Sequence, residues 1–154
     1  MKALTRLLLV NWHYFQNTVI DFGNINFLTG KNSAGKSTII DALQVVLMGE
    51  TRSVAFNRAA SKKSERTLKS YLIGSMGEDI ENGNKSLRDG KDFSTYIVAE
   101  FYDDFKSAFF CLGAVFDTFA DGSDINRRFF WLKNSIPANS FIENGKTMDS
   151  RRMT

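Results

Sequence analysis

The chain has 154 residues, which is the size of one domain and leaves room for a hydrophobic core. Hydrophobic residues make up 43% of it and charged residues 24%, as in ordinary globular proteins, and its one cysteine, Cys111, excludes an internal disulfide. A formal net charge of +3 permits contact with nucleic acid without demanding it.

The first ten residues contain Lys2 and the apolar run 7–10, which together suggest a signal peptide. Arg6 interrupts this pattern, and no small-residue cleavage site follows it. No other stretch approaches the length of a membrane span. With its single cysteine, which is typical of a reducing compartment, the sequence predicts a cytoplasmic protein without membrane contact.

Three strands are predicted before residue 30. Residues 4–12 and 18–22 are the first two, and the apolar run 25–29 is typical of a buried third strand. Between the second and the third, Gly23 and Asn24 are residue types that accept positive φ angles. We therefore expect these two strands to form a hairpin with a tight turn.

The segment 11–18 between the first two strands is both polar and aromatic. This segment lies close in sequence to the glycine-rich stretch that begins at residue 30, and its role can be interpreted in two ways. Either His13 or Tyr14 touches a nucleotide base or phosphate, or the aromatic side chains only cover the hairpin and His13 lies at the surface. Spacing alone favours the second interpretation.

Residues 30–37 form a complete G-x-x-x-x-G-K-[ST] phosphate-binding motif. A polyphosphate carries several negative charges and needs many donors at close range, so glycine at both ends lets backbone N–H groups turn inward. Lysine at position 7 of the motif reaches the phosphates, and the serine after it is the expected protein ligand of Mg²⁺. The predicted nucleotide contacts are Gly30, Lys31, Asn32, Ser33, Ala34, Gly35, Lys36, Ser37 and Thr38, with Ser37 also the metal ligand.

A helix is predicted directly after the motif. Apolar residues recur at helical spacing from Ile39 to Leu47, and Gly49 is a natural C-terminal stop. Strand, loop and helix thus follow one another in the order that this motif requires. The sequence therefore predicts a P-loop site for ATP and Mg²⁺.

The middle of the chain changes in composition. Residues 51–70 are rich in basic side chains that could reach the nucleotide or a DNA backbone, or form a solvated face. A short helical stripe follows at Leu68, Tyr71, Leu72 and Ile73. Residues 74–92 hold four Gly and many polar residues, so we expect a mobile loop.

Four strands are predicted after residue 92, at 93–102, 109–116, 127–133 and 141–148, the last centred on the turn pair Asn144-Gly145. Asp103 and Asp104 suit the turn between the first two. These strands predict a second antiparallel sheet.

An acidic residue that holds Mg²⁺ is also needed for hydrolysis. The nearest match is Glu100, which follows four strand residues, but Phe101 and Tyr102 continue the strand beyond it. Glu100 is therefore either a metal-site acid or an outward-facing strand carboxylate. The sequence has no Ser-Gly-Gly signature, and no glutamine after Gln44 that could act as a lid sensor.

The order of these elements resembles the opening of SMC-type and related DNA-repair ATPase heads, which are ABC-class ATPases. The likeness extends to the MukB-like condensin subunits, in particular the JetC subunit of the Wadjet plasmid-defence system. The residues that carry it are 11–22, 30–37, 40–43, 56–60, 66–68, 71–72, 93–96 and 100–102.

The resemblance implies an α/β fold of ABC/SMC type, in which residues 1–154 are the N-terminal lobe of the head. Within it, 1–50 hold strands, P-loop and helix, 51–92 the basic and mobile loops, and 93–154 an antiparallel β segment. It implies that Arg58 lies near the nucleotide and that His13 stands where relatives carry a basic contact residue. The missing signature and metal acid would lie in the C-terminal lobe.

The same resemblance implies four partners: the C-terminal lobe of the same head, a second SMC-like head, kleisin-type subunits and DNA. ATP would engage two heads and its hydrolysis would release them. Such a protein would act in the cytoplasm and could associate with the nucleoid. Two alternatives stay open. One is a compact, self-sufficient P-loop NTPase that uses Glu100, and the other is a truncated, non-catalytic fragment that binds a partner chain.

Overall fold

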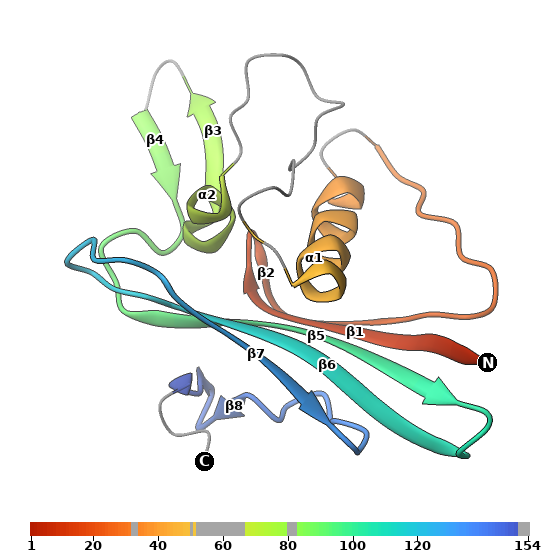
Figure 1. The fold of residues 1–154 in the computed structure, drawn as a ribbon. Helices are drawn as coiled ribbons and strands as arrows, with labels where there is room; N and C mark the ends of the chain where they lie inside the picture. Colours follow the sequence, from red (N-terminus) through yellow and green to blue (C-terminus); the bar gives the residue numbers. More distant parts are fainter. Residues whose placement is uncertain (32–33, 50, 52–66, 80–82, 151–154) are drawn as a thin grey trace.

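One antiparallel sheet of five strands organises the molecule, in the order β2-β1-β5-β6-β7 (Figure 1). It is seen in a computed structural model that describes the chain except residues 32–33, 50, 52–66, 80–82 and 151–154. The strands are β1 (Lys2–Trp12), β2 (Phe15–Asp21), β5 (Phe93–Asp103), β6 (Ala108–Thr118) and β7 (Asn126–Leu132). Each strand pairs antiparallel with its neighbours.

Two helices and two small hairpins complete the described structure. Helix α1 (Lys36–Met48) ends at Gly49, whose φ of 63° is the left-handed geometry that glycine adopts freely. Helix α2 (Leu68–Ile73) begins with a capping box between Thr67 and Ser70. The hairpins are β3 (Ser75–Asp79) with β4 (Gly83–Ser86), and β8 (Ile142–Glu143) with β9 (Lys146–Thr147).

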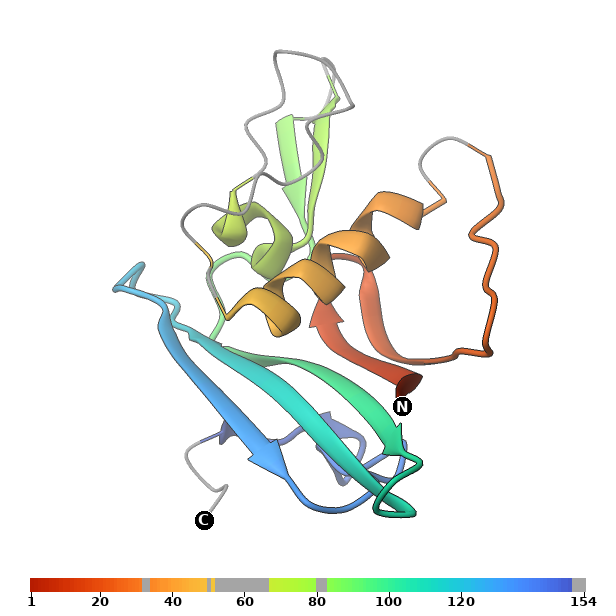
Figure 2. The ribbon, with the colours of Figure 1, turned by 45° about the vertical axis from the view of Figure 1, so that its right-hand side comes forward.

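The sheet is covered on both faces. Leu7 and Leu9 of β1 point towards α1, where they join one core cluster. Leu8 and Val10 point to the opposite face, where they pack with Phe141 of the C-terminal segment. Figures 1 and 2 show α1 and α2 on one side of the sheet and the β8 segment on the other. This burial on both faces explains why residues 7–10 of β1 are all apolar, since a central strand that is covered on both sides has no face open to water.

The predicted positions of α1, α2 and the strands of the sheet are confirmed, but two predictions about their grouping are wrong. The strands after residue 92 do not form a second sheet, because β5 pairs with β1 along its length, from Lys2 opposite Asp103 to Val10 opposite Tyr96. Residues 74–92 are not one loop, since β3 and β4 pair within them. The glycine and polar residues of this stretch are typical of turns, and their composition did not predict that a short hairpin forms there.

The predicted third strand, residues 25–29, is also absent. No described residue pairs with this segment as a strand, and Gly23 and Asn26 instead bond to each other's amide and carbonyl groups. Ile25 and Phe27 are 79% and 84% exposed. A strand needs a neighbour for its backbone groups, and the apolar pattern alone does not supply one.

Within the described residues, no helix has the length and apolar character needed to cross a membrane.

Candidate phosphate-binding site

Both glycines of the motif occupy conformations that other residues rarely adopt. Gly30 has a φ of 149° and Gly35 a φ of 94°. A Cβ on Gly35 would also overlap the hydroxyl of Tyr14 and lie 3.2 Å from Cζ of Phe15. The motif therefore needs glycine at position 35 for backbone geometry and for the close approach of the β1–β2 turn.

Gly35 is the N-cap residue of α1, directly before Lys36, and no side chain caps this helix end. The first turn of a helix leaves N–H groups without intrahelical partners, and its dipole favours an anion. The preceding loop turns back on itself, with the Ala34 amide donating to the Lys31 carbonyl at 3.2 Å. This arrangement has the form of a cradle for phosphate oxygens.

The polar side chains of the motif are placed differently from one another. Nζ of Lys36 donates to the carbonyls of Gly30 at 2.6 Å and Lys31 at 2.9 Å. Ser37 is half-buried in the first turn of α1, whereas the side chain of Thr38 is only 3% exposed. Ser37 thus retains a position from which to hold Mg²⁺, and Thr38 faces the core.

Helix α1 is fixed to the rest of the molecule by two polar contacts. The indole N–H of Trp12 donates to the Thr38 carbonyl at 2.9 Å. One turn further on, the buried carboxylate of Asp41 accepts a hydrogen bond from the hydroxyl of Tyr71 on α2. The rings of Trp12 and Tyr71 stack with their centroids 4.7 Å apart. The start of α1 is therefore held by β1 and α2 together.

The turn at His13 and Tyr14 is anchored to α2 and to Arg88. The His13 amide donates to the Tyr71 carbonyl at 2.9 Å, and the Arg88 guanidinium donates to the His13 carbonyl. Arg88 also donates to the Leu72 carbonyl at 2.9 Å, and burial lowers its pKa to about 10. The His13 ring lies 5.3 Å from that of Tyr71, while Tyr14 is the residue that reaches Gly35.

Glu100 does not lie at this site, which corrects its interpretation as a metal-site acid. Along β5, Ile97 and Ala99 face α1, so Glu100 points to the opposite face of the sheet. Its carboxylate accepts from Arg6 at 2.6 Å and 2.9 Å. Burial opposes ionisation, but the hydrogen bonds from Arg6, Ser135 and Thr5 outweigh it and lower the Glu100 pKa to about 2.

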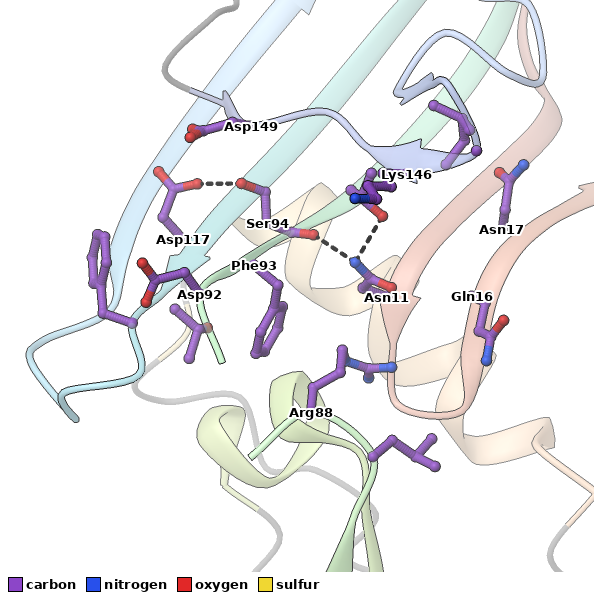
Figure 3. A pocket seen from close by; sticks show the side chains of 16 residues that line it. Asn11, Gln16, Asn17, Arg88, Asp92, Phe93, Ser94, Asp117, Lys146 and Asp149 are labelled. Atoms are coloured by element: carbon purple, nitrogen blue, oxygen red, sulfur yellow. Dashed lines mark hydrogen bonds between the residues drawn. The ribbon is translucent and has the colours of Figure 1, made fainter. Parts of the chain in front are cut away.

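A cavity of about 740 Å³ lies elsewhere (Figure 3). It is bounded by the β1–β2 turn, the start of β5 and the β8–β9 hairpin, and none of its lining residues belongs to the motif. Asn11 spans its wall, donating to the Ser94 carbonyl and the Thr147 hydroxyl, both at 3.0 Å. Both signs of charge line it, Arg88 on one side and Asp117 on the other, so it favours no single ligand class.

Three of the predicted contact residues, Asn32, Ser33 and Arg58, lie outside the described residues. The structure brings together Gly30, Lys36 and the start of α1, and it adds contacts that the sequence did not reveal. Arg88 is one of them, because an isolated arginine in a glycine-rich stretch carries no motif. The bond between Asp41 and Tyr71 is another, since nothing in their spacing of 30 residues marks them as partners.

A family model described as the P-loop containing region of an AAA domain matches residues 4–63. The match covers most of β1 and all of β2, the motif and α1, so this part of the chain is a P-loop NTPase region. A P-loop region of this kind implies nucleotide binding, usually together with Mg²⁺. Comparison with curated proteins gives no match.

Proposed function

We propose that the chain is the ATP-binding N-terminal lobe of an SMC-type ATPase head that works on DNA. The P-loop region would hold ATP through Gly30, Lys36 and the N-terminal turn of α1, with Mg²⁺ on Ser37. When bound, Mg²⁺ neutralises charge on the phosphate oxygens. The glycine geometry and the uncapped helix start are the features that fit these groups.

One observation supports the idea of a lobe that a second lobe completes. The apolar segment that leads into the motif pairs with no strand among the described residues, and Phe27 is 84% exposed. On α1, which follows the motif, Ile40 and Leu47 are 47% and 53% exposed. Exposed apolar side chains at this density mark a surface that a partner covers.

The proposed occupant of this surface is the C-terminal lobe of the same head. A second SMC-like head, kleisin-type subunits and DNA are the further partners that the resemblance implies. The mild basic character of the whole chain, with a pI near 9.0, supports contact with DNA. A plasmid-defence role of the Wadjet kind would follow from the same assignment.

The proposal is tested by Mg-ATP binding and steady-state hydrolysis of the 154-residue chain beside Lys36→Ala and Glu100→Gln. We expect the unmodified chain to bind ATP, Lys36→Ala to lose binding, and none of the three to turn ATP over at an appreciable rate. Turnover that both substitutions abolish would establish a self-sufficient NTPase and refute the half-head proposal. Failure of the unmodified chain to bind nucleotide would support the alternative of a non-catalytic, partner-binding fragment.

Phe27→Ser separates the half-head from a compact NTPase by a second route. An exposed side chain contributes little to the isolated lobe, so the free energy of unfolding should change by less than about 0.5 kcal/mol. A compact NTPase would bury this strand, and the same change would then cost about 3 kcal/mol or more. The matched control is Phe116→Ser, which removes a fully buried ring of the same type and should be strongly destabilising.

DNA contact is tested by the salt dependence of binding to a DNA duplex. Each phosphate that a basic side chain neutralises makes the logarithm of the affinity fall more steeply with the logarithm of salt concentration. A response that is flat in salt would refute a phosphate-contacting role for the basic residues of the chain.

A further inference from the structure

The hydroxyl of Tyr14 is a buried polar group without a hydrogen-bond partner among the described residues. Buried hydroxyls in folded proteins nearly always have a partner, because an unsatisfied donor loses its bonds to water without replacement. The ring itself is only partly buried, so the burial is specific to its polar end. Such a group indicates an acceptor that the described part of the chain does not supply.

This hydroxyl is aimed at the phosphate-binding motif. It lies against Gly35, with Cζ of the Tyr14 ring only 3.0 Å from the place that a Cβ on Gly35 would take. Gly35 is the N-cap of α1, whose first turn carries the unpaired N–H groups and no side-chain cap. The phenol therefore reaches the end of the helix where the phosphate chain of a nucleotide binds.

The position of Tyr14 is built into the fold. The preceding residue, His13, has a φ of 50° and is held through its amide by Tyr71 and through its carbonyl by Arg88. On the other side, the Tyr14 ring packs on Phe15 with centroids 4.7 Å apart. A loose surface tyrosine would have none of these constraints.

We propose that Tyr14 donates a hydrogen bond from its hydroxyl to a phosphate oxygen of the nucleotide, which makes it a binding residue outside the motif. The inference rests on the nucleotide binding proposed above. Phosphate oxygens are acceptors only, and a neutral phenol supplies the matching donor without adding charge. Tyr14, rather than His13, is then the residue of this turn that contacts the ligand.

Tyr14→Phe is the direct test, because it removes the hydroxyl and keeps the ring that packs on Gly35. With Mg-ATP as the titrant in calorimetry, we expect the affinity to fall about tenfold, as for loss of a hydrogen bond to a charged acceptor. Sodium tripolyphosphate should show a similar fold loss, since the contact is with phosphate rather than with the base. Tyr102→Phe, near the far end of β5, is the matched control and should bind like the unmodified chain.

A second measurement separates binding from a structural role. Without nucleotide, Tyr14→Phe should unfold at the same temperature as the unmodified chain or at a higher one, because a buried unsatisfied hydroxyl has been removed. A lowered unfolding temperature would assign the hydroxyl a structural role and overturn the inference. Unchanged ATP affinity in Tyr14→Phe would also overturn it, while the nucleotide binding itself would stand if Lys36→Ala still failed to bind. If the unmodified chain bound no nucleotide, both proposals would fall.

Discussion

Substituting Glu100 with Gln removes one negative charge from the network that joins β1, β5 and the segment at Ser135. In the folded chain the Glu100 pKa falls from 4.5 to about 2, since the hydrogen bonds from Arg6, Ser135 and Thr5 outweigh the effect of burial. A difference of this size corresponds to about 3 kcal/mol of folding free energy. Because the Arg6 side chain is 30% exposed and partly screened by water, we expect a loss of about 2 kcal/mol at pH 7.

The pH dependence has a definite sign. A carboxylate whose pKa is lower in the folded state stabilises the protein above the unfolded pKa near 4.5, and this contribution is lost as the pH falls towards 2. Urea unfolding followed by circular dichroism between pH 7 and pH 2.5 should show this loss in the unmodified chain and a flatter curve in Glu100→Gln. The control is Asp124→Asn, which removes an exposed charge. Its stability should follow the same pH dependence as that of the unmodified chain. Equal stability of Glu100→Gln and the unmodified chain at pH 7 would refute the reasoning.

Three further substitutions test the packing around the site. Gly113→Ala would place a methyl group 2.1 Å from Cζ of Phe130, so thermal unfolding should show a cost of about 1–3 kcal/mol, and an unchanged stability would contradict the β6–β7 register. Tyr71→Phe leaves the buried carboxylate of Asp41 without this donor, and urea unfolding should show a loss of about 1–3 kcal/mol; an unchanged midpoint would contradict the α1–α2 link. Gly30→Ala forces a side chain into a φ of 149°, so calorimetry should show weakened ATP binding, and unaltered affinity would argue against the loop geometry described here.

The sequence predicted the elements that carry strong local signals. The glycine, lysine and serine of the motif, the helical spacing after it and the β-rich composition of β5 and β6 were sufficient to place α1 and those strands. Pairing between distant strands was not predictable, because the register of β1 against β5 joins residues about ninety positions apart and depends on both faces being buried. The apolar run 25–29 was misassigned since local pattern does not report whether a neighbouring strand exists.

At the candidate site, too, the sequence predicted some features and only the fold revealed others. Position 35 had to be glycine on motif grounds, but only the fold shows that Tyr14 fills the space a side chain would need. The carboxylate of Glu100 fitted a loose acidic pattern, and only the alternation of β5 shows that it faces away from α1. The first question was thus decided by the position of the β1–β2 turn, and the second by side-chain direction across the sheet.

The contacts of Lys36 affect which anions the motif accepts. Its ammonium group already has two acceptors, the carbonyls of Gly30 and Lys31, at 2.6 Å and 2.9 Å. An ammonium group has three N–H donors, so two are used inside the loop and one is left for an incoming anion. The backbone N–H groups of the loop and of the start of α1 must then supply most of the remaining contacts to phosphate oxygens. We therefore expect affinity for an anion to rise with the number of phosphate groups that these amides can reach at once.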